Sequence, residues 1–198
     1  MTLERPLTPT GMRDLRERAR AVVGSVEAGG PILVLQHGQP AAVLIRHAEA
    51  ERWAAFERSL AALHAIGVYP ELARDTSELT SVVDGQAPLD RAAIERLAAM
   101  PREITAPLRT VHITALRERL AEHLDEVKSG RTLTVTSGGD LVATMISPRE
   151  YDRLRSLARV AAWFRAAGID LGSADAADIA AWVADRRRAV IDGAEAAG

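Results

Sequence analysis

The sequence predicts an α+β fold in which one supersecondary unit occurs twice: a strand, a helix, a β-hairpin and a long helix. The segment that begins Leu15-Arg-Glu-Arg aligns without a gap with the segment that begins Leu116-Arg-Glu-Arg. The offset of 101 positions persists to the glycine pair Gly67 and Gly168. In both segments, apolar residues first recur at helical spacing and then follow strand-like patterns. We therefore expect two tandem units, a helical connector between them and a C-terminal helix.

The first helix of each unit is predicted from its apolar periodicity. In the second unit, Thr114 is a candidate N-cap and Gly130 a stop signal for one amphipathic helix. The stripe of this helix consists of Leu116, Leu120, Leu124 and Val127. In the first unit, Asp14 or Thr10 is the candidate cap and Gly29 the stop. Its stripe consists of Leu15, Ala19, Val22, Val23 and Val26.

A β-hairpin follows each first helix. In the second unit, threonines alternate with Leu133 and Val135, and Gly138-Gly139 supplies the positive φ angles of a tight turn. In the first unit, residues 32–35 are apolar on both faces, so both sides of this strand need cover. We expect the other unit to provide it.

The long helix of the second unit has a specific start signal. Ser147 is the expected N-cap, Pro148 suits the first helical position and Glu150 completes a capping box. Both long helices are expected to end at Gly67 and Gly168. Their apolar stripes consist of Ala50, Trp53, Phe56, Leu60 and Leu63, and of Tyr151, Leu154, Leu157, Ala161 and Phe164.

These boundaries predict four segments. The first unit spans residues 1–69, the connector 70–108, the second unit 109–169 and the C-terminal helical tail 170–198. A proline-bounded stretch of the connector is expected to hold one short helix around Ile94 and Leu97, with a domain boundary near Pro101.

Composition excludes several protein classes. The 198 residues include no cysteine, which rules out disulfides and thiolate chemistry and fits a reducing compartment. No apolar run reaches the roughly 20 residues of a membrane span, and the N-terminus lacks a signal-peptide core. We expect a cytoplasmic protein without a membrane partner. The net charge of −2 argues against a chain coated in nucleic acid, although a local basic face remains compatible with it.

The order of these elements resembles the Phd/YefM family of antitoxins from bacterial toxin–antitoxin modules. The resemblance rests on the "LR" pair in the first helix, the Val-x-x-Gly stop, the hairpin ending in "PAAVLI" and the "SPREYDRL" start of the long helix. It implies a small α+β domain that dimerises and binds operator DNA, followed by a segment that wraps a toxin. Two copies in one chain would form a monomeric pseudo-dimer, or else like copies would pair in a homodimer.

The resemblance also implies the residues that contact DNA. The arginine of the "LR" pair corresponds to Arg16 and Arg117. Further candidates around these two positions are Arg13, Arg18, Arg20, Arg109, His112 and Arg119. The alternative is that these side chains line solvated helix faces and form ion pairs at i, i+4.

The basic charge is unevenly distributed between the units. Residues 1–47 carry six arginines against four acidic residues, whereas residues 102–147 carry six basic and six acidic residues. The turns read "QHGQ" and "SGGD" where the family usually has arginines. DNA binding is therefore expected to be weak and to fade steeply with salt.

Toxin contact is expected from the later helices, where most aromatic residues lie. The candidate residues are Trp53, Phe56, Trp163, Phe164, Ile179, Trp182, Arg186 and Arg187. The alternative for the aromatic residues is a place in the core. The implied partner is a Fic-like, RelE-like or PIN-like protein toxin, with the connector and the tail as candidate binding segments.

No catalytic, metal-binding or cofactor-binding motif exceeds background in the sequence, so we expect a non-enzyme. The expected function is that of an antitoxin that neutralises a co-encoded toxin and represses its own operon. Two alternatives stay open. The chain could be an orphan DNA-binding regulator, or a structural or interaction protein that kept the fold and lost DNA binding.

Overall fold

The structure of the chain, a computed structural model, describes residues 5–65 and 109–166. We call these two ranges the first half and the second half. The expected glycine stops at Gly67 and Gly168, and the connector helix around Ile94 and Leu97, lie outside the described residues. So does the expected boundary near Pro101.

Contacts divide the chain into two compact units. One unit contains residues 1–51 and 101–158, and we call it the sheet unit. The other contains residues 52–100 and 159–198. The elements below belong to the sheet unit, apart from the later parts of the two long helices.

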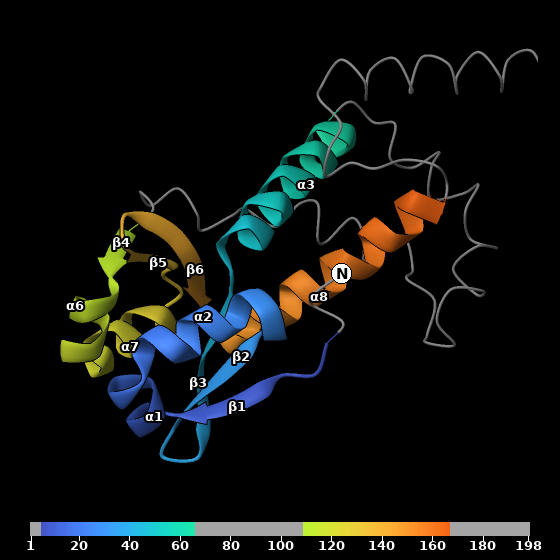
Figure 1. Ribbon diagram of the computed structural model, residues 1–198. Coiled ribbons are helices and arrows are strands. Elements are labelled where there is room, and N and C mark those ends of the chain that lie inside the picture. Colours follow the sequence, from blue (N-terminus) through green and yellow to red (C-terminus); the bar gives the residue numbers. More distant parts are fainter. Residues whose placement is uncertain (1–4, 66–108, 167–198) are drawn as a thin grey trace, which may run out of the picture. The chain divides into compact units, whose positions relative to one another are not determined.

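The two halves contain the same elements in the same order (Figure 1). The first half comprises β1 (Thr8–Gly11), α1 (Met12–Glu17), α2 (Ala19–Gly29), β2 (Ile32–Gln36), β3 (Gln39–Arg46) and α3 (His47–Ala65). The second half comprises β4 (Arg109–His112), α6 (Ile113–Glu118), α7 (Leu120–Lys128), β5 (Leu133–Ser137), β6 (Asp140–Ile146) and α8 (Pro148–Ala166).

The strands form one six-stranded mixed sheet in the order β1-β2-β3-β6-β5-β4. In each half the outer pair is parallel and the hairpin pair antiparallel. The expected α+β class is confirmed. Local irregularities also recur at the same offset, because the hairpin register shifts after Val34 in the first half and after Val135 in the second.

The halves meet where β3 pairs antiparallel with β6. Leu44 lies opposite Met145, and these positions are 101 residues apart. On either side, Val43 pairs with Ile146 and Ile45 with Thr144. These two pairs are equivalent, because the offset of 101 converts Val43 into position 144 and Ile146 into position 45. The register is thus self-complementary, as it is in a contact across a two-fold axis.

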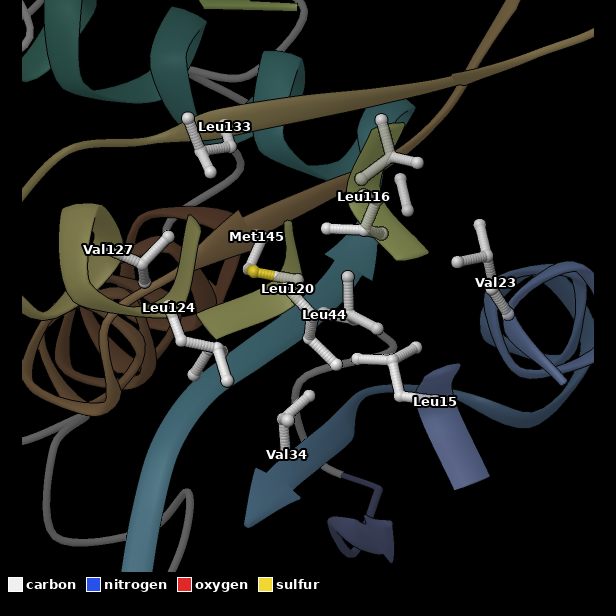
Figure 2. Close-up of a cluster of buried hydrophobic side chains, with 14 of the residues drawn as sticks. Leu15, Val23, Val34, Leu44, Leu116, Leu120, Leu124, Val127, Leu133 and Met145 are labelled. Atoms are coloured by element: carbon white, nitrogen blue, oxygen red, sulfur yellow. The ribbon is translucent and has the colours of Figure 1, made fainter. Parts of the chain in front are cut away.

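One hydrophobic core contains side chains from both halves. Alternate residues of the central strands point into it, including Ala42, Leu44, Ala143 and Met145. Figure 2 shows Leu44 and Met145 among leucines and valines of both halves. Helices α2 and α7 each pack against β3 and β6, so each helix contacts a strand of the other half.

This arrangement corrects the expectation that one unit would cover both faces of the other unit's sheet. The halves join edge to edge, and α2 and α7 each cross the junction onto a strand of the other half. Leu33 and Leu35 of β2 stay half-buried. The reason is that the free edges of β3 and β6 satisfy their backbone groups by pairing with each other, which stacking two sheets would not achieve.

Both hairpins turn on residues with positive φ. Gly138 and Gly139 have φ angles of 65° and 96°, so the predicted tight turn is confirmed. In the first half, His37 and Gly38 occupy the same conformation with φ angles of 52° and 76°. Two central residues with positive φ define the type I′ turn, whose twist matches that of the strands.

The start of α8 agrees with its sequence signal. The Ser147 hydroxyl accepts a hydrogen bond from the Glu150 N–H at 3.1 Å, and Pro148 is the first helical residue. The predicted capping box is only half formed, because the Glu150 carboxylate accepts from the Arg153 guanidinium at 2.7 Å and not from the Ser147 N–H. The predicted stripe is buried at Trp53, Phe56, Leu60, Tyr151, Leu154, Leu157 and Ala161. The structure does not describe the side chains of Leu63 and Phe164.

Candidate nucleic-acid interface

The first helix of each half is broken in two, which corrects the expectation of one continuous helix. The break lies at Arg18 in the first half and at Arg119 in the second. Their backbone angles are nearly the same, with φ −125° and ψ 31° against φ −118° and ψ 33°. The two helices stay in helical register across the break, because the N–H of Arg18 still bonds the carbonyl of Asp14, four residues earlier, at 2.8 Å. Neither glycine nor proline marks it, so the sequence held no signal.

The helix starts also differ from the expected caps. His112 is the N-cap of α6, and its Nδ1 accepts a hydrogen bond from the Thr114 N–H at 3.3 Å. Thr114 therefore lies inside the helix and is not its cap. Gly11 is the N-cap of α1 and makes no side-chain bond, so neither Thr10 nor Asp14 caps that helix. An N-cap needs extended backbone angles, and His112 and Gly11 are the residues that adopt them.

The arginines predicted to contact DNA are all exposed, but two of them are held in ion pairs. Arg13 bonds Glu17 at 2.8 Å, which is the i, i+4 pair of the alternative reading. Arg109 on β4 pairs with Glu126. Within the described part of the chain, the side chains of Arg16, Arg18, Arg20 and Arg119 have no hydrogen-bonding or ionic partner.

Arg16 and Arg117 lie where the halves meet. Helices α1 and α6 are in contact (Figure 1), and the Arg117 Nε donates a hydrogen bond to the backbone carbonyl of Arg16 at 3.0 Å. This bond brings together the two arginines of the "LR" pairs, which are 101 positions apart in the sequence. The bond fixes the Arg117 guanidinium and leaves its terminal N–H groups available.

An open groove of about 340 Å³ lies between the α1–α2 break and α6. It brings together three of the predicted residues, Arg18, Arg20 and Arg117. It does not include Arg13, Arg16, Arg109, His112 or Arg119. Glu17 and Thr114 also line the groove, and the sequence did not predict them as site residues. The contact between α1 and α6 brings them there, and this long-range contact has no local signal in the sequence.

Two of the aromatic candidates for toxin contact are buried. Trp53 and Phe56 are 3% and 2% exposed, and their rings pack edge to face with centroids 5.9 Å apart. This burial favours the core alternative for both residues. Trp163 and Phe164 belong to α8, but their side chains are not described. Ile179, Trp182, Arg186 and Arg187 lie outside the described residues.

Polar contacts that cross between the halves were not predicted. His47 Nδ1 lies 3.1 Å from the Thr144 hydroxyl, and Lys128 donates to the side chain of Gln36. Among the described residues, no three histidine, aspartate or glutamate side chains are grouped to hold a metal ion. No helix within residues 5–65 and 109–166 is long and apolar enough to cross a membrane.

Comparison with known proteins gives one match. No curated protein and no solved structure is significantly similar to the chain. Residues 109–179, which begin at β4 and extend beyond α8, match the family model described as "Antitoxin Phd_YefM, type II toxin-antitoxin system". The match supports a Phd/YefM antitoxin domain in this part of the chain.

Proposed function

We propose that this protein is an antitoxin that binds and neutralises a protein toxin encoded beside it and represses its own operon. The observation that carries the proposal is the family match over residues 109–179. The match also points to a non-enzymatic regulatory protein. The toxin belongs to the Fic-like, RelE-like or PIN-like classes that the family resemblance implies.

We further propose that residues 1–69 are a second copy of the unit in residues 109–169. The support is the repetition of structure at a constant offset. Strand pairing, hairpin bulge, helix break and positive-φ turn all recur 101 residues apart. An unrelated pair of segments would share the order of elements at most. Residues 70–108 then form the connector and residues 170–198 the tail.

The two copies are proposed to act as an intramolecular dimer. The self-complementary pairing of β3 with β6 and the single core support this arrangement. So do the hydrogen bond from Arg117 to the Arg16 carbonyl and the hydrogen bond between His47 and Thr144. Because both copies belong to one chain, pairing does not depend on protein concentration.

The DNA-contacting surface is proposed to lie around the junction of α1, α2 and α6, with Arg18, Arg20 and Arg117 on one side and Arg16 and Arg119 on the other. The exposure of these side chains, the groove that three of them line and the bond from Arg117 to the Arg16 carbonyl support it. Toxin contact is proposed for the end of α8 and for the tail, with Trp163, Phe164, Ile179, Trp182, Arg186 and Arg187 as contact residues. Since Trp53 and Phe56 are buried, they would reach a toxin only if α3 opened.

Co-expression with the neighbouring open reading frame tests the proposal. The neighbour alone should arrest growth, and co-expression should restore it and give a complex that co-purifies on a tag. Removing residues 170–198 should abolish rescue, whereas Arg18→Ala should leave rescue unchanged. One toxin per chain by light scattering would indicate one working toxin-binding segment, and two would indicate a complete duplication. Absence of both complex and rescue would contradict the antitoxin role.

A further inference from the structure

The groove between the α1–α2 break and α6 is strongly cationic for a specific reason. Glu17 is its one acidic lining residue, and Arg13 already engages that carboxylate at 2.8 Å. Three arginines, Arg18, Arg20 and Arg117, therefore line the groove with little compensating negative charge. The bond from Arg117 to the Arg16 carbonyl holds one of them in place before any ligand arrives.

The equivalent surface on the other side of the junction differs in charge. Exchanging the halves places Arg119 where Arg18 lies and Arg16 where Arg117 lies. The position of Arg20, however, is taken by Ala121, and that of Ala21 by Glu122. Together with Glu118, Glu122 offsets the two arginines that remain unpaired on this side. The backbone is duplicated, but only one side keeps the positive charge.

The residue types in the groove select its ligand. Exposed arginines bind phosphate groups with bidentate, charge-assisted hydrogen bonds. The lining includes no aromatic side chain, whereas sites for single-stranded nucleic acid stack bases on aromatic rings. The groove therefore fits the backbone of duplex DNA, whose phosphates it can contact without reading bases.

We propose that the chain grips duplex DNA asymmetrically, with the Arg18–Arg20–Arg117 groove carrying the phosphate contacts and the opposite surface contributing little. A homodimer presents two identical surfaces and favours palindromic sites. This chain, with its two diverged copies, requires only one well-contacted half-site. The inference rests on the proposed DNA binding, but not on the identity or existence of the toxin.

A matched pair of variants tests the asymmetry. Arg18 and Arg119 occupy the same backbone conformation in the two halves, so Arg18→Ala and Arg119→Ala remove the same group on opposite sides. The probe is a labelled duplex of about 30 base pairs, roughly three turns of B-DNA, from the region immediately upstream of the coding sequence. Fluorescence anisotropy over a series of KCl concentrations gives the affinity and its salt slope.

Arg18→Ala and Arg20→Ala should each weaken binding several-fold. Each should also make the slope of log K against log salt shallower by about 0.9, the value for one lost phosphate contact. Arg119→Ala should change neither quantity appreciably. The double variant Ala121→Arg/Glu122→Ala installs the first-half residues on the opposite side and should increase both affinity and slope. Circular dichroism checks that each variant is folded.

Equal losses for Arg18→Ala and Arg119→Ala would overturn the proposal, and so would wild-type protein that does not bind the duplex at low salt. Growth rescue by the same variants keeps the two hypotheses separate. Rescue with symmetric DNA binding would contradict only the asymmetry. Asymmetric DNA binding without any toxin partner would contradict only the antitoxin role.

Discussion

Leu44 and Met145 show how much of this fold depends on single side chains at the junction. Both are fully buried, and they lie opposite each other at the centre of the β3–β6 pairing. Each also contributes to the core that contains both halves. A change at either position therefore affects the contact between the halves as well as the packing within one of them.

Leu44→Ala should lower the free energy of unfolding by about 2–5 kcal/mol, because it removes buried methyl groups and leaves a cavity. Urea denaturation monitored by circular dichroism measures the loss. Leu141→Ala is the control, since Leu141 is 48% exposed and its truncation should change stability by no more than about 0.5 kcal/mol. Similar losses for the two variants would show that the junction is not packed as described.

Tyr151 gives stability a dependence on alkaline pH. Burial raises the pKa of Tyr151 above its ordinary value of 10.0; Glu49 and Asp152 add to this rise and Arg155 opposes it. The folded state thus favours the neutral phenol. Its stabilisation is complete below the unfolded pKa and is lost as pH rises through the higher folded pKa. Tyr151→Phe should therefore make the fall of unfolding free energy above about pH 10 shallower. Urea midpoints across this range measure it, and an unchanged pH profile would contradict the assignment.

At the scale of elements, the turns and the helix starts depend on backbone conformation as much as on side chains. Gly138-Gly139 meets the demand of a type I′ turn without strain. His37 meets the same demand with a side chain in the left-handed region, which most residues disfavour. The two hairpins are therefore alike in shape but not in local cost.

His37→Asn should stabilise the protein by roughly 0.5–1 kcal/mol, because Asn-Gly is a preferred type I′ pair and asparagine tolerates positive φ. Gly38→Ala is the opposing control and should destabilise, since Gly38 has a φ of 76°. Thermal unfolding of both variants checks the sign. A destabilised His37→Asn protein would mean that the histidine side chain makes a contribution beyond the turn.

At the scale of the whole molecule, the pairing of the two halves determines the expected oligomeric state. The edges of β3 and β6 are already satisfied within the chain, and the core is shared by both halves. A second chain is therefore not needed to complete this sheet. The remaining edge strands, β1 and β4, are only four residues long, which limits strand pairing between molecules.

Sedimentation should therefore find a monomer at micromolar and at nanomolar concentration. The thermal midpoint should stay constant over this range, because intramolecular pairing is independent of dilution. A dimer that persists at nanomolar concentration, or a midpoint that falls on dilution, would favour pairing of like copies between two chains.

The sequence by itself determined the features that local chemistry controls. The α+β class, the order of elements, the Gly138-Gly139 turn and the Ser147 cap followed from periodicity and from turn and cap preferences. These features depend on neighbours within a few residues, which is why the sequence reveals them. The candidate DNA-contacting arginines came instead from the family resemblance, and three of them line one groove.

Only the tertiary structure decided the features that depend on distant contacts. The β3–β6 junction, the contact of α1 with α6 and the bond from Arg117 to Arg16 join residues about 100 positions apart. The breaks at Arg18 and Arg119 and the His112 cap carry no standard local signal. Edge-to-edge pairing prevailed because it satisfies the backbone groups of both central strands and buries Leu44 and Met145 together, an outcome that no local window of the sequence contains.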